Sequence, residues 1–170
     1  TVPTFGSVTP ADNAYIKTSS RPVSYTLSEN ISSGLIKYVW TSGTADPSGT
    51  PAGTHTHNLS GGELSSGQQS ADLNGGDDLQ DGAYYTLTVQ GTDAAGNVAS
   101  VSHSNVKYDT TIPNFGSVTP ATNGASINFE GSKVRFTNSE ALSAGNATYT
   151  RTGGTADTLS PQSHNLNSSE

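Results

Sequence analysis

The sequence predicts an all-β protein in which one sandwich-type module is followed by an incomplete second copy of itself. Residues 1–11 recur at 111–121 with nine of eleven residues identical, so the chain contains an internal repeat. Short runs of alternating apolar and polar residues, typical of half-buried strands, are separated by clusters of Gly, Pro, Asn, Asp and Ser. No stretch of useful length has the periodicity of a helix.

The repeat continues beyond its opening and then stops part-way. Three further segments recur: 23–29 as 134–140, 43–46 (Gly-Thr-Ala-Asp) as 154–157, and 57–59 as 164–166. We therefore expect a complete module at 1–110 and the first half of a second module at 111–170.

Alternation and turn signals divide the first copy into strands. The predicted strands are 5–8, 23–27, 35–41, 54–59, 68–73, 83–89 and 98–108. The clearest is 83–89, and residues 93–97 read as a hairpin turn. About seven short strands in about 100 residues predict a β-sandwich.

One set of spacings narrows this prediction to an immunoglobulin-like sandwich. In that fold the sixth strand is entered through a corner whose Tyr hydroxyl bonds back to the backbone upstream. Asp81, Ala83, Tyr85 and Leu87 have the spacing of that corner. Tyr25 and Leu87 would then occupy the positions of the usual disulfide, and Tyr38 that of the core Trp. Trp40 aligns with Arg151, which predicts a position at a sheet margin.

Composition excludes several classes of partner and chemistry. The net charge is −7 and the seven basic residues form no cluster, so we expect no nucleic-acid partner. No apolar run is long enough to predict a membrane span, and the absence of Cys excludes disulfides and thiol chemistry. Without an initiator Met or a signal peptide, the chain is expected to be a mature product or an internal fragment.

Five motifs of the first copy resemble the bacterial Ig-like repeats of large secreted surface proteins and adhesins. They are SYTLSE (24–29), TSGTAD (41–46), DGAYYTLTV (81–89), GTDAAGN (91–97) and YDTTIP (108–113). The resemblance covers 1–110 and the first half of the next repeat. It implies tandem, extracellular, non-catalytic modules, often rigidified by calcium where they meet.

Oxygen-bearing side chains are expected at the pole of each module where the chain enters. Glu29, Asp93 and Asn97 would occupy that pole in the first module, and Asp109 and Glu140 would meet at the entry to the second. Carboxylate and amide oxygens are the ligands that calcium requires, so an interdomain calcium site is one interpretation. The alternative is that Asp93 and Asn97 make turn hydrogen bonds while Glu29 and Asp109 are solvated.

Two other polar groups have a structural interpretation and a metal-binding one. The first is an acidic stretch that contains Asp72, Asn74, Asp77, Asp78 and Asp81. We interpret it as a solvated turn, and adventitious cation binding is the alternative. His55 and His57 share a strand face, but no third metal ligand is evident. The recurrence of His57 as His164 favours a structural hydrogen bond.

The expected function is a non-catalytic spacer in a secreted bacterial surface protein. No nucleophile elbow, zinc motif or phosphate loop is present. Its partners would be neighbouring Ig-like repeats of the same or another chain; no host or matrix ligand is identifiable. The alternatives are a carbohydrate- or protein-binding module, with Tyr84 and Trp40 as an aromatic platform, and a subunit of an extracellular filament.

The incomplete second copy leads to a prediction about exposure. Residues 111–170 contain no counterpart of the strands at 83–89 and 98–108. Phe136 and Tyr149 should therefore be more exposed than their counterparts Tyr25 and Tyr38.

Overall fold

The computed structural model describes residues 1–17, 22–73, 79–120 and 133–167. Its chain divides into two compact units, unit 1 at Thr1–Thr111 and unit 2 at Ile112–Glu170. Each unit contains its own sheets, and every sheet of more than two strands lies in unit 1.

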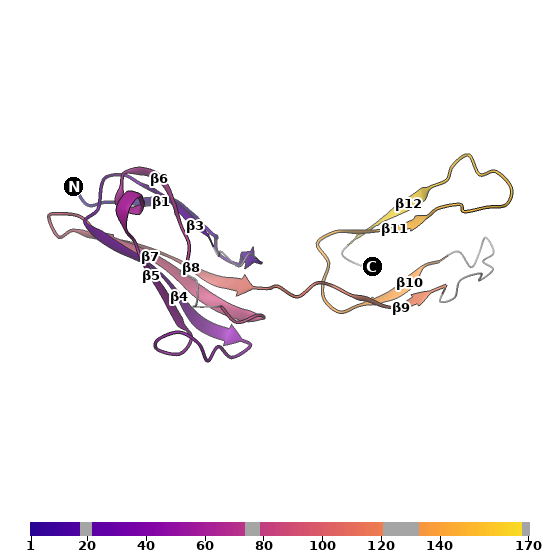
Figure 1. Cartoon of the computed structure of the whole chain (residues 1–170), viewed down its shortest axis with the longest axis horizontal. Coiled ribbons are helices and arrows are strands. Elements are labelled where there is room, and N and C mark those ends of the chain that lie inside the picture. The colour runs from indigo at the N-terminus through magenta and orange to yellow at the C-terminus, as the bar shows by residue number, and fades with distance from the viewer. Residues whose placement is uncertain (18–21, 74–78, 121–132, 168–170) are drawn as a thin grey trace. The chain divides into compact units, whose positions relative to one another are not determined.

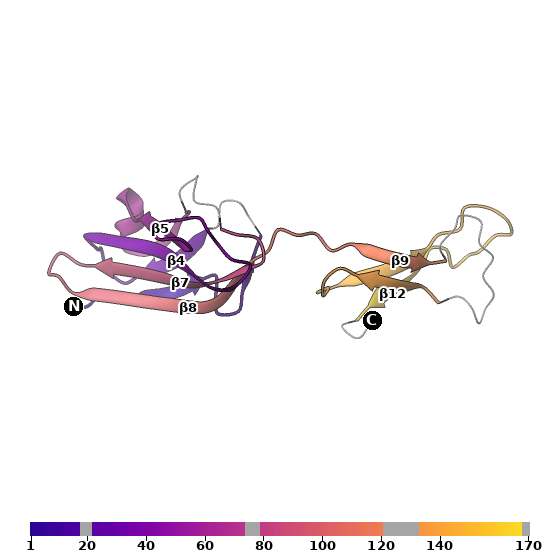
Figure 2. The same ribbon diagram turned by 90° about the horizontal axis from the view of Figure 1, so that it is seen from below.

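Unit 1 is a sandwich of two sheets, as Figure 1 shows. Its strands are β1 (Phe5–Thr9), β2 (Tyr15–Ile16), β3 (Val23–Leu27), β4 (Ser33–Gly43), β5 (Thr54–Asn58), β6 (Gly67–Ala71), β7 (Ala83–Thr92) and β8 (Val98–Tyr108). One sheet has the order β1-β3-β6 and the other the order β2-β8-β7-β4-β5. Figure 2 shows β4, β7 and β8 side by side in the larger sheet. The predicted immunoglobulin-like β-sandwich is therefore confirmed.

Two short elements of unit 1 were not predicted. Strand β2 pairs in parallel with β8, placing Tyr15 opposite Lys107, and two residues are too few to show an alternating pattern. A 3₁₀ helix at Gly61–Leu64 follows Ser60, whose backbone N–H donates to the Glu63 carboxylate at 2.7 Å. The Ser-x-x-Glu spacing is a helix-start signal that this short turn uses.

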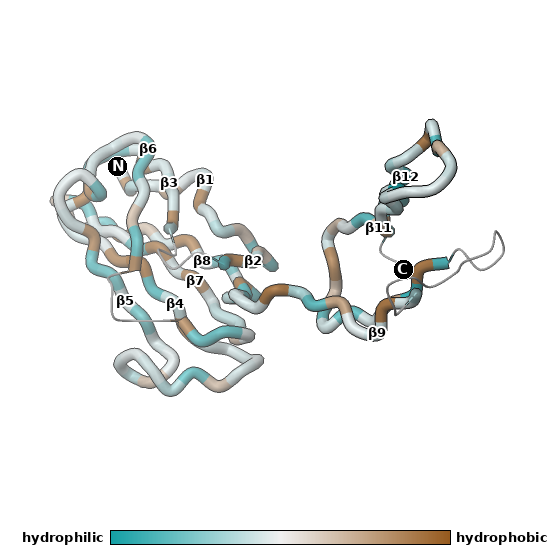
Figure 3. Tube along the Cα trace, turned by 45° about the vertical axis from the view of Figure 1, so that its right-hand side comes forward, coloured by the Kyte–Doolittle hydropathy of each residue, from teal (hydrophilic) through white to brown (hydrophobic). Residues whose placement is uncertain are grey.

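Aromatic residues fill the core between the two sheets. Tyr25, Tyr38 and Leu87 are fully or almost fully buried, as expected for the positions of the usual disulfide and core Trp. The rings of Tyr38 and Tyr85 meet edge to face at 6.1 Å, and those of Phe5 and Tyr25 at 5.6 Å. Figure 3 shows hydrophobic positions spaced along the strands rather than gathered in one run. Interlocking aromatic rings thus take the place of a disulfide.

The predicted tyrosine corner is present, with one difference. The Tyr85 hydroxyl accepts a hydrogen bond from the backbone N–H of Gln80 at 2.8 Å, as predicted. Asp81 contributes differently from what the corner suggested: its carboxylate accepts from the Thr110 N–H at 2.6 Å and from the Thr111 hydroxyl at 2.7 Å. Asp81 therefore fastens the chain where it leaves unit 1.

Close approach of β4 and β7 requires a glycine at Gly34. A Cβ added to Gly34 would lie 2.7 Å from the Gln90 carbonyl oxygen, and this backbone atom belongs to a paired strand. We expect Gly34→Ala to lower the free energy of unfolding by about 1–3 kcal/mol because the strands must separate. Urea denaturation measures this loss. Gly62→Ala is the control, since no atom lies within 4 Å of its added Cβ; equal stability of the two variants would contradict the prediction.

The described residues of unit 2 form two separate strand pairs. Strand β9 (Phe115–Thr119) pairs with β10 (Arg135–Asn138), and β11 (Gly145–Tyr149) pairs with β12 (Gln162–Leu166). These pairs correspond to β1–β3 and β4–β5 of unit 1. Among the described residues of unit 2, no strand corresponds to β7 or β8.

The exposure predicted for the second copy is confirmed. Tyr149 is 39% exposed and Phe136 is only partly buried, whereas Tyr38 and Tyr25 are fully buried. Phe115 is likewise 50% exposed although its counterpart Phe5 is buried. The same inward residues are present in both units, but in unit 2 no described strand covers them.

Local contacts confirm that the two copies align beyond the strands. The Trp40 indole N–H donates to the carbonyl of Thr44 at 2.9 Å, and the Arg151 Nε–H donates to that of Thr155 at 2.8 Å. Both bonds reach four residues along the chain, around Gly43 or its counterpart Gly154, each with φ of +78°. The aligned loops therefore have one shape despite the exchange of Trp for Arg.

Candidate functional site

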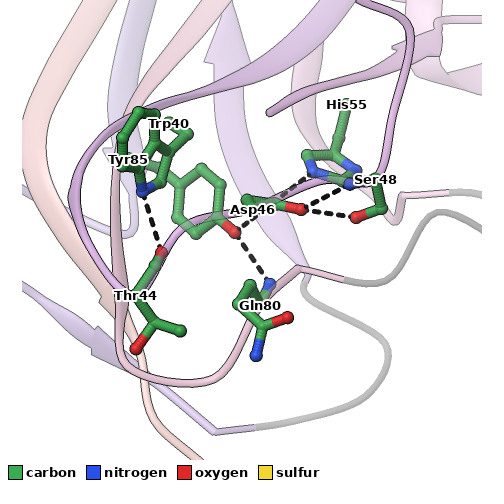
Figure 4. Close-up of polar contacts among 7 residues, drawn as sticks. All are labelled: Trp40, Thr44, Asp46, Ser48, His55, Gln80 and Tyr85. Atoms are coloured by element: carbon green, nitrogen blue, oxygen red, sulfur yellow. Dashed lines mark hydrogen bonds and ion pairs between the residues drawn. The ribbon is translucent and has the colours of Figure 1, made fainter. Parts of the chain in front are cut away.

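The most concentrated polar chemistry of unit 1 is a buried network centred on Asp46. Asp46 lies in the loop between β4 and β5, and its side chain is completely buried. Its carboxylate contacts His55 Nε2 at 2.7 Å and accepts hydrogen bonds from the Ser48 N–H and from the Ser48 and Tyr85 hydroxyls. Figure 4 shows these side chains converging on Asp46 from the loop, β5 and β7. One carboxylate thereby links three segments that are separate in sequence.

Electrostatics in this network favour the charged form of Asp46. Burial acts to raise the pKa of Asp46, but hydrogen bonds from Ser48, Tyr85 and His55 outweigh it and lower the pKa to about 2. Burial and the adjacent Asp46 carboxylate raise the pKa of the Tyr85 hydroxyl. Asp46 is therefore an anion, and Tyr85 a neutral donor, near neutral pH.

The arrangement is suited to holding a loop rather than to catalysis. Nucleophilic catalysis by Ser requires its hydroxyl to contact the His that takes its proton. Here the Ser48 hydroxyl bonds to Asp46, and the completely buried His55 contacts the same carboxylate. His55 Nδ1 is buried without a hydrogen-bond partner in the described part of the chain. The network therefore fixes the loop against β5 and β7.

Acid should weaken unit 1 through Asp46. Because the pKa of Asp46 is lower in the folded chain than its ordinary 3.8, its contribution is complete above about pH 4 and is lost as the pH falls towards 2. The loss is about 2 kcal/mol. Urea denaturation of the parent chain and of Asp46→Asn, at a pH above 4 and at a pH near 2, measures this loss of stability. The variant should be less stable but lose less on acidification; an equal loss in both would assign the acid sensitivity to other carboxylates.

The two strand histidines have structural partners. His55 and His57 share a face of β5, as predicted, and both side chains are buried. His57 Nε2 lies 3.1 Å from the Glu63 carboxylate oxygens. This contact confirms the structural hydrogen bond expected for His57. Within the described ranges, no three His, Cys, Asp or Glu side chains lie close enough together to hold a metal ion.

The predicted calcium ligands of unit 1 take part in hydrogen bonds. Glu29 accepts from the Thr1 hydroxyl at 2.8 Å, and Asn97 Nδ2 donates to the Asp93 carboxylate at 2.8 Å and to the Thr1 carbonyl at 3.1 Å. Backbone N–H groups of Ala95 and Asn97 also donate to Asp93 and help lower the pKa of its carboxyl. Both Asp93 oxygens thus serve the turn, as the alternative interpretation expected, and this arrangement does not by itself fit a cation.

The remaining predicted ligands lie in different units. Asp109 of unit 1 forms an ion pair with Lys107 at 2.7 Å. Glu140 belongs to unit 2, and its Oε1 is buried with no hydrogen-bond partner among the described residues. An interdomain calcium site thus remains a prediction. In the acidic stretch, Asn74, Asp77 and Asp78 lie outside the described residues, Asp72 is exposed, and Asp81 holds Thr110 and Thr111.

The suggested aromatic platform of Tyr84 and Trp40 is wrong. Trp40 lies opposite Tyr85 in the β4–β7 register, so these two side chains share a sheet face. Tyr84 precedes Tyr85 on the strand and therefore points to the other face, where Lys107 Nζ lies 5.9 Å from its ring centre. Trp40 is at the sheet margin and 37% exposed, as its alignment with Arg151 predicted. The two aromatics cannot stack on one ligand.

Sequence reasoning missed Asp46 as a buried residue. It lies in a stretch rich in Gly, Pro and Ser, which reads as an ordinary loop. A signal was nevertheless present, because Gly-Thr-Ala-Asp recurs in the second copy at 154–157. A loop whose Asp recurs in both copies is under a structural constraint that composition alone does not show.

Comparison with known families agrees with the fold and with the motifs. The model of the bacterial Ig-like domain family matches residues 1–110. The chain belongs to this family. Bacterial Ig-like domains of this family are typical of bacterial surface proteins and are generally non-catalytic. Searches of curated proteins and of solved structures gave no significant match.

The match covers the whole of unit 1 except its last residue. The buried Asp46 network and the tyrosine corner lie inside this bacterial Ig-like domain, and Asp81 joins the domain to Thr111, the first residue beyond the match. Over the described residues, no helix has the length and apolarity needed to cross a bilayer.

Proposed function

We propose that this bacterial Ig-like chain is a non-catalytic, extracellular spacer of a bacterial surface protein, giving reach and stiffness through serial repeats. The observation that carries the proposal is the fastening of the connecting segment to unit 1. Asp81 binds both Thr110 and Thr111, and Lys107 pairs with Asp109 just before them. The next residues include Pro113, whose φ is fixed by its ring. These contacts fix the last residues of unit 1 up to Thr111, and this supports the proposal of a stiff connection, which a spacer requires.

The hydrogen-bond partners of the buried polar side chains agree with this proposal. The buried acidic and His side chains of unit 1 contact other groups of the same unit, as Asp46, His57 and Asp93 illustrate. Groups committed to internal hydrogen bonds are poorly placed to recognise a ligand. The carbohydrate alternative also loses its predicted platform, because Tyr84 and Trp40 face opposite ways.

The spacer proposal predicts that Asp81→Ala loosens the connection. Cysteines introduced as Gln68→Cys and Ser143→Cys, both exposed positions in a Cys-free chain, carry a dye pair for single-molecule energy transfer. We expect Asp81→Ala to broaden the distance distribution between the dyes because two hydroxyl contacts and one backbone contact are lost. The matched control is Asp72→Ala, an exposed carboxylate of the same loop region. A parent distribution already as broad as that of Asp81→Ala would contradict a stiff connection.

We also propose calcium as a stabiliser at the entry to unit 2, with Glu140 and Asp109 as its first candidate ligands. The support is that Glu140 Oε1 is buried and has no hydrogen-bond partner among the described residues. Calcium is bound by oxygen ligands such as carboxylates. The expected result is a higher melting temperature in calcium than in chelator, and no such difference in Glu140→Gln. An identical melting temperature with calcium and with chelator in the parent chain would end the proposal.

A further inference from the structure

A row of three side chains crosses the outer face of the larger sheet of unit 1. Tyr15 of β2 lies opposite Lys107 of β8, and Lys107 lies opposite Tyr84 of β7. Residues opposite one another on paired strands point to the same face, so the three side chains stand side by side. Lys107 Nζ lies 5.5 Å from the ring centre of Tyr15 and 5.9 Å from that of Tyr84. We call this set, Tyr15, Lys107 and Tyr84, the tyrosine row.

The two rings of the tyrosine row are held in place but open to solvent. Ile16, the other residue of β2, packs against the core and anchors the strand, whereas Tyr15 is 70% exposed. Tyr84 is half-buried, and its ring packs on Gly43, where an added Cβ would lie 3.0 Å from the ring Cδ2. Strand β8 lies between β2 and β7, so the strands that carry the two rings are about 10 Å apart. This separation is close to the length of two sugar units in an extended chain.

Between the rings lies an ion pair that retains capacity for further hydrogen bonds. Lys107 Nζ contacts Asp109 Oδ2 at 2.7 Å, and the two side chains are 23% and 16% exposed. An ammonium group has three N–H donors and a carboxylate has two acceptor oxygens, so this one contact leaves donors and an acceptor for a ligand. Because the charges of Lys107 and Asp109 cancel, the tyrosine row suits the hydroxyl groups of an uncharged ligand.

The face around the tyrosine row is rich in hydroxyl groups. Its outward positions include Thr54, Thr56, Thr86, Thr88, Ser100 and Ser102. Apart from the row, the outward positions of the described strands β4, β5, β7 and β8 carry one charged side chain, Lys37, which lies opposite Thr88. Acidic partners are bound by clusters of basic side chains, and membranes or protein cores by large apolar patches. This face has neither, so its chemistry favours a ligand with many neutral hydroxyl groups.

We propose that this face binds a neutral polysaccharide chain that lies across β7, β8 and β2. Tyr84 and Tyr15 pack against alternate sugar rings, because an aromatic ring offers an apolar surface to the C–H groups of a sugar. The Lys107–Asp109 pair hydrogen-bonds to hydroxyl groups of the sugar between them, since charged groups make the stronger hydrogen bonds. The aromatic partner of Tyr84 is therefore Tyr15, not Trp40, and β2 places it there. This site goes beyond the spacer role and does not depend on it.

Isothermal titration calorimetry of the whole 170-residue chain tests the proposal. The probes are four neutral polysaccharides (hydroxyethylcellulose, laminarin, mannan and dextran) and one anionic polysaccharide, alginate. We expect at least one neutral probe to bind, with an affinity that changes little between about 0.1 M and 1 M salt, because the tyrosine row has no net charge. Binding to none of the neutral probes would overturn the proposal. So would binding to alginate alone that disappears at high salt.

Substitutions in the tyrosine row separate this site from other surfaces. Tyr15→Ala should weaken binding about tenfold, and Tyr15→Phe should not, because the ring rather than the hydroxyl makes the contact. Tyr84→Ala should weaken binding in the same way from the other end of the row. The matched control is Lys37→Met on the same face, which should leave the affinity unchanged.

The denaturation midpoint of each variant, followed by Trp40 fluorescence, checks that unit 1 remains folded. Tyr15 is an exposed residue, so its removal should leave this midpoint almost unchanged. Parent-like affinity in both Tyr15→Ala and Tyr84→Ala would overturn the assignment of the site. An equal loss of affinity in Lys37→Met would also overturn it, since binding would then depend on positive charge and not on the rings.

Discussion

Asp46→Ala is expected to lower the free energy of unfolding of unit 1 by about 3–5 kcal/mol. The substitution leaves His55 Nε2 and the Tyr85 hydroxyl buried without their shared acceptor, and it frees the loop between β4 and β5. The fluorescence of Trp40 reports the transition of unit 1 alone, because this is the only Trp of the chain and it lies beside that loop. Guanidinium or urea denaturation therefore yields the loss directly.

The second repeat provides the matched control for this experiment. Asp157→Ala removes the aligned carboxylate, but Asp157 is exposed and belongs to unit 2. We expect the control to change the Trp40 transition by less than about 0.5 kcal/mol. Combining Asp46→Ala with Tyr85→Phe should cost less than the sum of the single changes, because both remove one contact. Strict additivity would show that Asp46 and Tyr85 do not act together.

Tyr38→Ala is expected to cost about 3–5 kcal/mol in the same measurement. Tyr38 is completely buried, packs edge to face on Tyr85 and lies opposite Leu87. Its removal leaves a ring-sized cavity between the two sheets, which neighbouring strands cannot collapse to fill. The expected signature is a lower denaturation midpoint with little change in slope.

Tyr149→Ala is the counterpart in unit 2 and should cost less than about 1 kcal/mol, since this ring is already 39% exposed. Unit 2 is followed through hydrogen exchange of β11. An equal cost for Tyr38→Ala and Tyr149→Ala would contradict the greater exposure of Tyr149.

The strands were predictable because apolar and polar residues alternate along them, so that every second side chain is buried. Residues 23–27 alternate strictly and form β3 with the predicted ends. Strands β4 and β7 run further than predicted, because pairing continues through Gly, Ser and Thr residues that carry no apolar signal. Backbone hydrogen bonds, not side chains, extend a strand beyond its apolar pattern.

The site was less predictable because it depends on contacts between segments distant in sequence. Asp46 meets Tyr85 across 39 positions of the chain, and no local pattern records that meeting. The same limit explains the mistaken aromatic platform, where the pairing of Trp40 with Tyr85 decides the face. The turn around Asp93 was easier to predict from the sequence. Asp-x-x-x-Asn is a local turn signal, and the hydrogen bonds between Asp93 and Asn97 lie within five residues of the chain.

The parallel pairing of β2 with β8 has a mechanical consequence. Tension on the protein pulls the chain before β2 and the chain after β8 in opposite directions. Because the two strands are parallel, this load runs along them, and the bonds Lys107 N–H to Ala14 O and Asp109 N–H to Ile16 O, both 2.9 Å, are loaded together. An antiparallel terminal pair loaded at one end would open bond by bond instead. The β2–β8 pair should therefore resist tension by shear, a property set by a strand of only two residues.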